Sequence, residues 1–219
     1  MNFNNIPPVT KYLLIINVVV FLLVYYILPT FGFSIEKNFI FLAGWFPFTE
    51  HFQFSQIITH MFMHGASFND IGEIIGGNWS HLFFNMFGLY MFGSAVEGYF
   101  REKNFLILYM LSGLGAFILH FFISYLIDDI NTPVVGASGA IFGITTAFAV
   151  LYPNTPMMLI FLPVPIKAKY FVAIYLGIEL FSGINGYQTG VAHFAHIGGA
   201  IIGFLLTRYW IRNRFQKWS

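Results

Sequence analysis

Four polar side chains lie in strongly apolar stretches: His81 and Asn85 in HLFFN, Ser138 in GASG, and His196 in AHIGG. A polar or ionisable residue inside a membrane span is costly, so it marks a functional site by default. A serine within hydrogen-bond reach of a histidine forms the nucleophile and general base of acyl transfer. The sequence therefore predicts Ser138 as a nucleophile and His196 as its base.

Acyl transfer also requires hydrogen-bond donors for the negative oxygen of the tetrahedral intermediate. Ser138 is expected at the start of a helix, where its backbone N–H is available and the helix dipole favours negative charge. His81 and Asn85 are four residues apart, so they share one helix face and can supply further donors. We predict these groups as the oxyanion site.

The orientation of His196 is predicted to depend on packing. We expect no Asp or Glu at its depth in the membrane, so the sequence predicts a Ser-His dyad. Phe142, one helical turn after Ser138, is the candidate aromatic residue that packs against the face of the His196 ring. His193, three residues before His196, is interpreted as a hydrogen-bonded structural histidine.

The composition places these residues in a membrane protein. Of 219 residues, 58% are hydrophobic and only 9% are charged, whereas soluble domains carry about 25% charged residues. Such a chain cannot cover a water-facing surface, so the bilayer is the expected solvent. The net charge of +1 gives no reason to expect nucleic acid, and the absence of cysteine excludes disulfides and thiolate chemistry.

Six stretches are apolar enough to be membrane spans, which need about 20 residues. The first follows a polar N-terminus and is interpreted as a retained span, because it is too long for a signal peptide. We predict an all-α membrane protein, a six-transmembrane-helix bundle in one domain, residues 1–219. The predicted spans cover about residues 12–31, 80–96, 105–126, 136–151, 170–180 and 190–210.

Positive charges indicate the orientation of these spans, because Lys and Arg collect in cytoplasmic loops. With both termini inside, every Lys and Arg except Lys37 falls on the cytoplasmic side, including a basic tail at about 211–219. Spans two, four and six then begin at the outer face. Ser138, His196, His81 and Asn85 all lie within roughly the outer 10 Å.

Small residues predict which helices touch. Span six carries Ala195, Gly199 and Gly203 at every fourth position, and span four carries Gly139 and Gly143. Small residues at this period let two helix backbones approach closely. If these two rows face each other, Ser138 and His196 come within hydrogen-bond range.

The long outer segment, about residues 32–79, is rich in aromatic residues. A structureless loop of this length is uncommon, so we expect short amphipathic helices in the membrane interface. The piece SFNDIGEIIGGN, within residues 66–78, is interpreted as a solvated insertion. The pair His60 and His64 is assigned to packing inside this segment.

Together these motifs resemble the rhomboid family of intramembrane serine proteases. The resemblance rests on HLFFN, GASG and AHIGGxxxG in this order, with THMFMHG upstream and FGSAVEGYFREKNF after span two. It covers most of the chain from His60 to Phe204. It implies cleavage of single-pass transmembrane substrates near the outer face, with small residues at the cleaved bond and helix-breaking residues nearby.

The resemblance also implies residue roles. Ser138 and His196 are the catalytic residues, with His81 and Asn85 in the oxyanion site. Glu97 is structural. The supporting positions are Gly136, Gly139, Phe142, His193 and Gly199. The resemblance implies no cofactor or metal, membrane lipid as the surroundings, and the minimal form found in the bacterial inner membrane.

The chain departs from the family in the insertion that separates MFMHG from WSHLFFN, and in lacking a Trp-Arg pair in the first outer segment. Residues 51–78 and the short fifth span are the candidate gating elements, because a helical substrate must enter sideways.

Other functions are weaker on the residues present. A metalloprotease would need H-E-x-x-H, which does not occur. An aspartyl protease would need two membrane aspartates, and every Asp is predicted in an outer loop. A transporter would need internal repeats. The remaining alternative is a non-catalytic rhomboid-like protein that binds or guides transmembrane helices.

Overall fold

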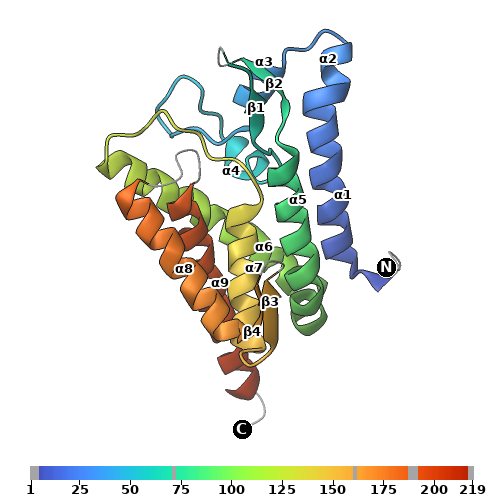
Figure 1. Ribbon diagram of the computed structural model, residues 1–219, viewed down its shortest axis with the longest axis vertical. Coiled ribbons are helices and arrows are strands. Elements are labelled where there is room, and N and C mark those ends of the chain that lie inside the picture. The colour runs from blue at the N-terminus through green and yellow to red at the C-terminus, as the bar shows by residue number, and fades with distance from the viewer. Residues whose placement is uncertain (1–4, 71–72, 160–161, 187–191, 217–219) are drawn as a thin grey trace.

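The computed structural model of the protein describes residues 5–70, 73–159, 162–186 and 192–216. The chain is mostly helical, and its helices gather around one central helix (Figure 1). Two short β-hairpins, absent from the all-α prediction, complete the described elements: β1 Ala66–Phe68 with β2 Ile74–Gly77, and β3 Pro156–Leu159 with β4 Leu162–Lys167.

The first helical segment runs from Pro8 to Thr30 and is slightly longer than predicted at its start. It comprises α1 (Pro8–Leu22), the π-helical turn η2 (Leu23–Ile27) and α2 (Leu28–Thr30). Pro8 suits the first position of a helix, where a backbone N–H has no intrahelical partner. The carboxylate of Glu97 accepts hydrogen bonds from the backbone N–H groups of Val9 and Thr10 and from the Thr10 hydroxyl. Glu97 therefore caps α1, in agreement with a structural role.

The second helical segment is divided at Arg101. It comprises α5 (Trp79–Gly88), η3 (Leu89–Gly93) and α6 (Ser94–Leu126). Arg101 has a φ of 69° and a ψ of 166°, which no helix contains. The chain descends through α5 and returns along the rest of α6 (Figure 1). The boundary predicted between residues 96 and 105 is therefore present as a sharp reversal.

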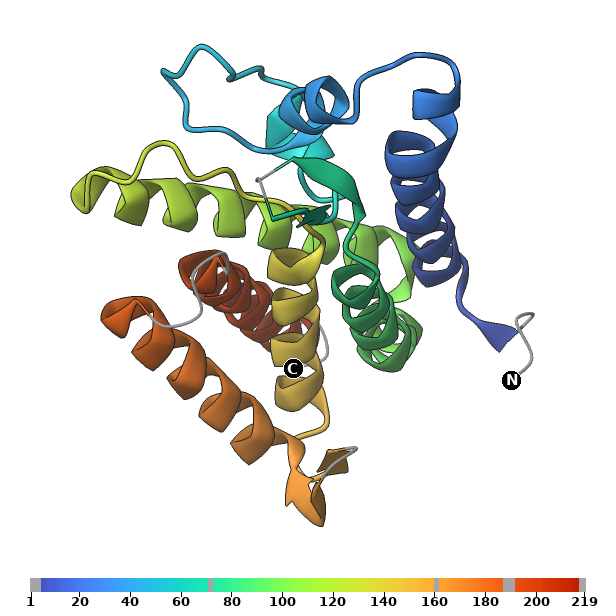
Figure 2. The ribbon, with the colours of Figure 1, turned by 45° about the horizontal axis from the view of Figure 1, so that its top comes forward.

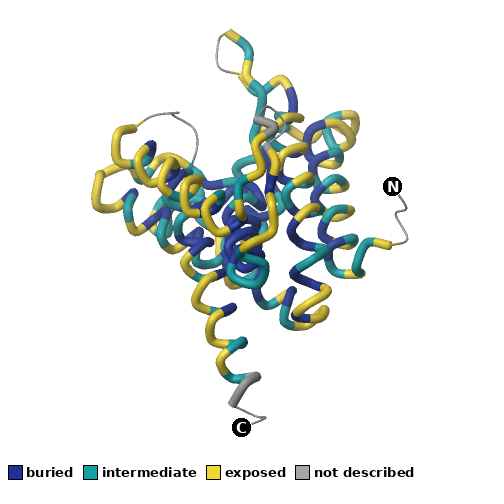
Figure 3. Tube along the Cα trace, turned by 60° about the horizontal axis from the view of Figure 1, so that its bottom comes forward, coloured by how far each residue is buried: buried dark blue, intermediate teal, exposed yellow. Residues whose placement is uncertain are grey.

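Helix α7 (Ser138–Leu151) is the centre of the bundle, with α5, α6, α8 (Ala168–Asn185) and α9 (His193–Gln216) around it (Figure 2). Eleven consecutive residues of α7, from Gly139 to Ala149, are buried. The buried part of the chain is concentrated in this region (Figure 3). Helix α8 is longer than the predicted fifth span, and part of the start predicted for the sixth span lies outside the described residues.

The predicted contact between small residues of α7 and α9 is present. A Cβ added to Gly199 would strike the backbone carbonyl of Gly139, and one added to Gly203 would strike the carbonyl of Gly143. Since Cβ atoms cannot occupy that space, glycine is required for the two backbones to meet. This close approach sets the distance between the start of α7 and the first turn of α9.

The outer segment contains the short helices α3 (Ile35–Leu42) and α4 (Gln56–Thr59), and their place in the membrane interface stays a prediction. The buried Gln56 side chain holds the segment together, because its amide donates to the carbonyls of Ile40 and His51 and accepts from the N–H of Gln53. Most described residues of the insertion are exposed or half-buried, and among them only Gly76 and Gly77 are buried. The insertion forms the β1–β2 hairpin, and the buried Gly77 packs on the aromatic rings of α1 and η2.

The outer segment is tied to the loop that precedes α7. Gly44 and Val134 exchange two backbone hydrogen bonds, and the Gly136 N–H donates to the carbonyl of His60 at 2.9 Å. These bonds position the loop just before Ser138.

Within the part of the chain that the structure describes, three helices are long and apolar enough to cross a membrane: Pro8–Thr30, the segment Trp79–Leu126 that Arg101 divides, and His193–Asn213. Ser138–Leu151 is a shorter apolar helix. The helices fit an integral membrane protein.

Two buried histidines of the outer segment predict acid sensitivity. Burial lowers the pKa of His60 to about 4 and the pKa of His64 to about 3, against about 6.5 in an unfolded chain. Below pH 6.5 the unfolded chain therefore binds more protons, so folding stability falls as the pH drops toward these values. We expect the thermal midpoint in detergent to decline steadily from pH 6.5 to pH 4.

The matched variants for this prediction are His60→Gln, which should flatten the decline, and His51→Gln, which changes a more exposed histidine of the same segment. A thermal midpoint that is constant from pH 7 to pH 4 would contradict the assignment.

Candidate active site

Ser138 is the first residue of α7, and the loop before it is shaped by Gly136. Gly136 has a φ of 109°, a region that residues with a Cβ rarely adopt. Ala137 provides the N-cap position, and no side chain among the described residues caps the helix by a hydrogen bond. The first N–H groups of α7 therefore remain available beside the Ser138 hydroxyl.

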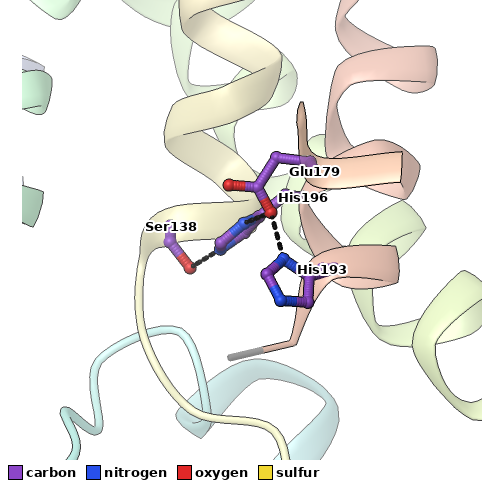
Figure 4. Close-up of polar contacts among 4 residues, drawn as sticks. All are labelled: Ser138, Glu179, His193 and His196. Atoms are coloured by element: carbon purple, nitrogen blue, oxygen red, sulfur yellow. Dashed lines mark hydrogen bonds and ion pairs between the residues drawn. The ribbon is translucent and has the colours of Figure 1, made fainter. Parts of the chain in front are cut away.

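The structure brings Ser138 and His196 together from α7 and α9. The Oγ atom of Ser138 lies 2.9 Å from Nε2 of His196 (Figure 4). His196 is buried, whereas Ser138 is only partly buried. The distance is that of a nucleophile hydrogen-bonded to its base. It follows from the glycine contact between α7 and α9, which places the two helix ends side by side.

The expectation that no acid lies near His196 is wrong. The Oε2 atom of Glu179, from α8, lies 2.8 Å from Nδ1 of His196, on the opposite side of the ring from Ser138 (Figure 4). The prediction considered only the helices that begin at the outer face. Helix α8 runs in the opposite direction, so Glu179, near its end, lies at the same depth as His196. The signal that could have revealed Glu179 was its place one residue before the end of the predicted fifth span.

His193 contacts the same carboxylate, as a structural histidine should. Its Nδ1 atom lies 2.7 Å from Oε2 of Glu179. One carboxylate oxygen thus faces two imidazole nitrogens, both from the first turn of α9. The three side chains are buried.

The ring of His196 is packed against Phe142. The two rings are stacked, with centroids 4.2 Å apart and planes within 10° of parallel. Phe142 also contacts Tyr175 of α8, with ring centroids 4.9 Å apart. Phe142 thus covers the face of the His196 ring, and Glu179 contacts its edge.

His81 lies at the same site, on the first turns of α5. Its Nδ1 atom accepts a hydrogen bond from the backbone N–H of Gly65 at 3.0 Å. A neutral imidazole then carries its proton on Nε2. That nitrogen faces Gly136, since a Cβ added there would lie 2.9 Å from it. His81 is thus set to donate toward the loop before Ser138.

Asn85 is buried one turn further along α5. Its Nδ2 donates to the carbonyl of His81 at 2.8 Å, and its Oδ1 has no hydrogen-bond partner among the described residues. One amide proton is therefore used within the helix. Asn85 thus lies on the same face of α5 as His81, as their spacing predicts.

The supporting glycines occupy the contact surfaces described above: Gly136 faces His81, while Gly139 and Gly199 lie where α7 and α9 meet. Among the described residues, no group of His, Asp and Glu side chains is arranged to hold a metal ion. Hydrogen bonds connect one hydroxyl, two imidazoles and one carboxylate in this site, and His81 is held beside them by the backbone N–H of Gly65.

Fold and site together define a helical membrane protein with a serine–histidine pair at the start of its central helix. Residues 51–213, well over half of the chain, match the Rhomboid domain family. This chain belongs to the rhomboid family.

Several curated proteins are similar to this chain. It is 33% identical over 150 residues to the rhomboid protease AarA of Providencia stuartii, covering 63% of this chain and 53% of that protein. It is 33% identical over 151 residues to the chloroplastic rhomboid-like protein 11 of Arabidopsis thaliana, covering 65% and 51%. It is 31% identical over 144 residues to the mitochondrial rhomboid protein 1 of Saccharomyces cerevisiae, covering 63% and 41%. The chain thus spans about half the length of the curated relatives it matches.

Proposed function

We propose that this chain is an intramembrane serine endopeptidase that cleaves transmembrane segments of single-pass membrane proteins near the outer membrane face. The observation that carries the proposal is the 2.9 Å contact between Ser138 Oγ and His196 Nε2 at the start of the central helix. The proposal is supported by membership of the rhomboid family and by similarity to AarA, a relative that is named a rhomboid protease.

The proposed reaction is acyl transfer to Ser138. His196 takes the hydroxyl proton as Oγ attacks the carbonyl carbon, and the tetrahedral oxyanion accepts hydrogen bonds from the Ser138 N–H and His81 Nε2. His196 then gives the proton to the leaving amine, and the acyl-enzyme forms. Water attacks this ester in the second half, with His196 again acting as base.

The same proposal includes the membrane arrangement. With six spans and both termini in the cytoplasm, Ser138, His81 and His196 lie in the outer half of the bilayer, and water reaches them from the outer face. The exposed aromatic side chains of the outer segment, including Phe48 and Phe54, suit insertion into the interface around the site. A bacterial inner membrane is the proposed location.

Substrate entry is proposed to occur between α8 and residues 51–78 of the outer segment. Helix α8 buries only Ala168, Val172, Glu179 and Ser182, and thus has few buried contacts with its neighbours for its length. A substrate segment, preferably with small residues at the cleaved bond, would approach Ser138 from this side. A disulfide joining α8 to α5 that left cleavage unchanged would contradict this route.

The test is cleavage of a tagged single-pass substrate by the purified protein in liposomes. Wild type should cleave it and react with a fluorophosphonate probe, whereas Ser138→Ala should lose both while retaining its thermal midpoint. Ser80→Ala, an exposed serine of α5, is the matched control and should keep both activities.

Cleavage that persists in Ser138→Ala would remove Ser138 as the nucleophile. The absence of cleavage and labelling in wild type, with substrate still bound, would favour the alternative function of a non-catalytic protein that binds or guides transmembrane helices.

A further inference from the structure

The contact between Glu179 and both histidines of α9 has a chemical consequence. We propose that Glu179 is a positioning residue that completes a Ser138–His196–Glu179 triad, and that His193 holds the carboxylate in place. The inference rests on the proposed function and deepens it. Its observation is a single Oε2 atom at 2.7 Å from His193 Nδ1 and 2.8 Å from His196 Nδ1.

The carboxylate of Glu179 determines where the proton of His196 lies. An ionised carboxylate only accepts hydrogen bonds, so the Nδ1 atom that faces it must carry a proton. A neutral His196 then has its lone pair on Nε2, the atom 2.9 Å from the Ser138 hydroxyl. This is the tautomer that can remove the serine proton. Glu179 therefore selects the form of His196 that acts as a base.

The charge of Glu179 also matters during the reaction. When the Ser138 proton moves to Nε2, His196 becomes an imidazolium ion inside the protein. A carboxylate at 2.8 Å stabilises that charge far more than packing against a neutral ring would. Glu179 stays ionised, forms no covalent bond and keeps no proton. The proton passes from Ser138 to His196 and then to the leaving amine.

Glu179 is itself costly to bury. The other buried residues of α8 are Ala168, Val172 and Ser182, so the only ionisable group on its buried face is the one at the catalytic depth. A buried carboxylate is costly unless it is hydrogen-bonded. His193 supplies a second donor from the same turn of α9 as His196. The pair of histidines thus offsets the burial of a group that packing alone does not need.

The competing explanation is that Glu179 only fastens α8 to α9. The variants Glu179→Gln, which keeps the shape without the charge, and Glu179→Asp, which keeps the charge on a shorter chain, separate the two. Ser182→Ala changes a buried polar residue three positions away on α8. Glu97→Gln changes a buried carboxylate that caps α1 far along the chain from this site.

For a positioning role we expect Glu179→Gln to lower kcat by roughly 10²–10⁴-fold, with KM changed by less than about threefold, because the loss falls on the transition state. The kcat of Glu179→Asp should be at least tenfold higher than that of Glu179→Gln. Ser182→Ala should retain the wild-type kcat, and Glu97→Gln should lower the thermal midpoint while folded molecules keep their kcat.

A readout independent of cleavage is ¹⁵N NMR of histidine-labelled protein, with the His196 signals assigned from their loss in His196→Gln. Wild type should show Nδ1 protonated and Nε2 unprotonated. Glu179→Gln should show both nitrogens partly protonated, which indicates mixed tautomers. Fluorophosphonate labelling of Ser138 should slow in parallel.

Two outcomes would overturn the inference: an unchanged kcat in Glu179→Gln, or an unchanged His196 tautomer together with only a lower thermal midpoint. Failure of the proposed function is a different result. Wild type would then neither cleave nor label, while the NMR comparison would still show whether Glu179 sets the tautomer of His196.

Discussion

Replacing His196 with glutamine is expected to reduce cleavage of a transmembrane substrate by roughly 10⁴-fold or more, because the nucleophile loses its base. The side chain is similar in volume, so the stacked position against Phe142 remains filled. Binding should be retained, because Ser138 and the surfaces that receive the substrate are unchanged. Cleavage is measured in liposomes, and binding is measured by cross-linking of the uncleaved substrate.

The matched control is His120→Gln. His120 is another buried histidine, but its hydrogen-bond partner is the carbonyl of Thr132 rather than Ser138. This variant should cleave at close to the wild-type rate. Equal losses in the two variants would show that any buried histidine is needed for folding and would remove the evidence for a base at His196.

Replacing His81 with alanine is expected to lower kcat by ~10²–10³-fold, the usual loss for one oxyanion donor. The reason is geometric: the Gly65 N–H occupies Nδ1, so the proton of His81 lies on Nε2, which faces the loop before Ser138. KM should change little, because the negative oxygen exists only in the transition state and intermediate. Single-turnover cleavage measures the effect on chemistry.

Asn85→Ala should have a smaller effect on kcat than His81→Ala, although the sequence predicted both residues as donors. The Asn85 amide already donates to the carbonyl of His81, so part of its function is to hold the turn that carries His81. A larger loss in Asn85→Ala than in His81→Ala would reverse this assignment. Ser80→Ala is the control for general damage to the start of α5.

The helical segments were largely predictable because their signal is local. The boundary between the second and third spans follows from the polar residues near Arg101, and the structure reverses there. The contact between α7 and α9 was also predictable, because Gly139 and Gly199 belong to rows of small residues with helical period. Such rows are rarely useful except where two backbones meet.

The two hairpins were not predictable in the same way. Residues 66–68 and 74–77 are short, and their polar and glycine-rich composition is typical of a loop. The hairpin that they form packs on the first helical segment, where a Cβ at Gly77 would strike the rings of Phe21 and Tyr25. That contact joins segments more than fifty residues apart, and no local pattern encodes it.

Residue types and depth along the helices were enough to select Ser138 and His196, since a hydroxyl and an imidazole at one level of a membrane protein have few structural uses. The sequence alone thus determined the membrane class, the candidate nucleophile and base, and the helix contact that joins them. Only the tertiary structure decided that Glu179 reaches His196, that the Gly65 N–H occupies Nδ1 of His81, and that Asn85 donates to the carbonyl of His81. Helical spacing sets the face and depth of a side chain, whereas the packing of helices decides which side chains meet and where their protons lie.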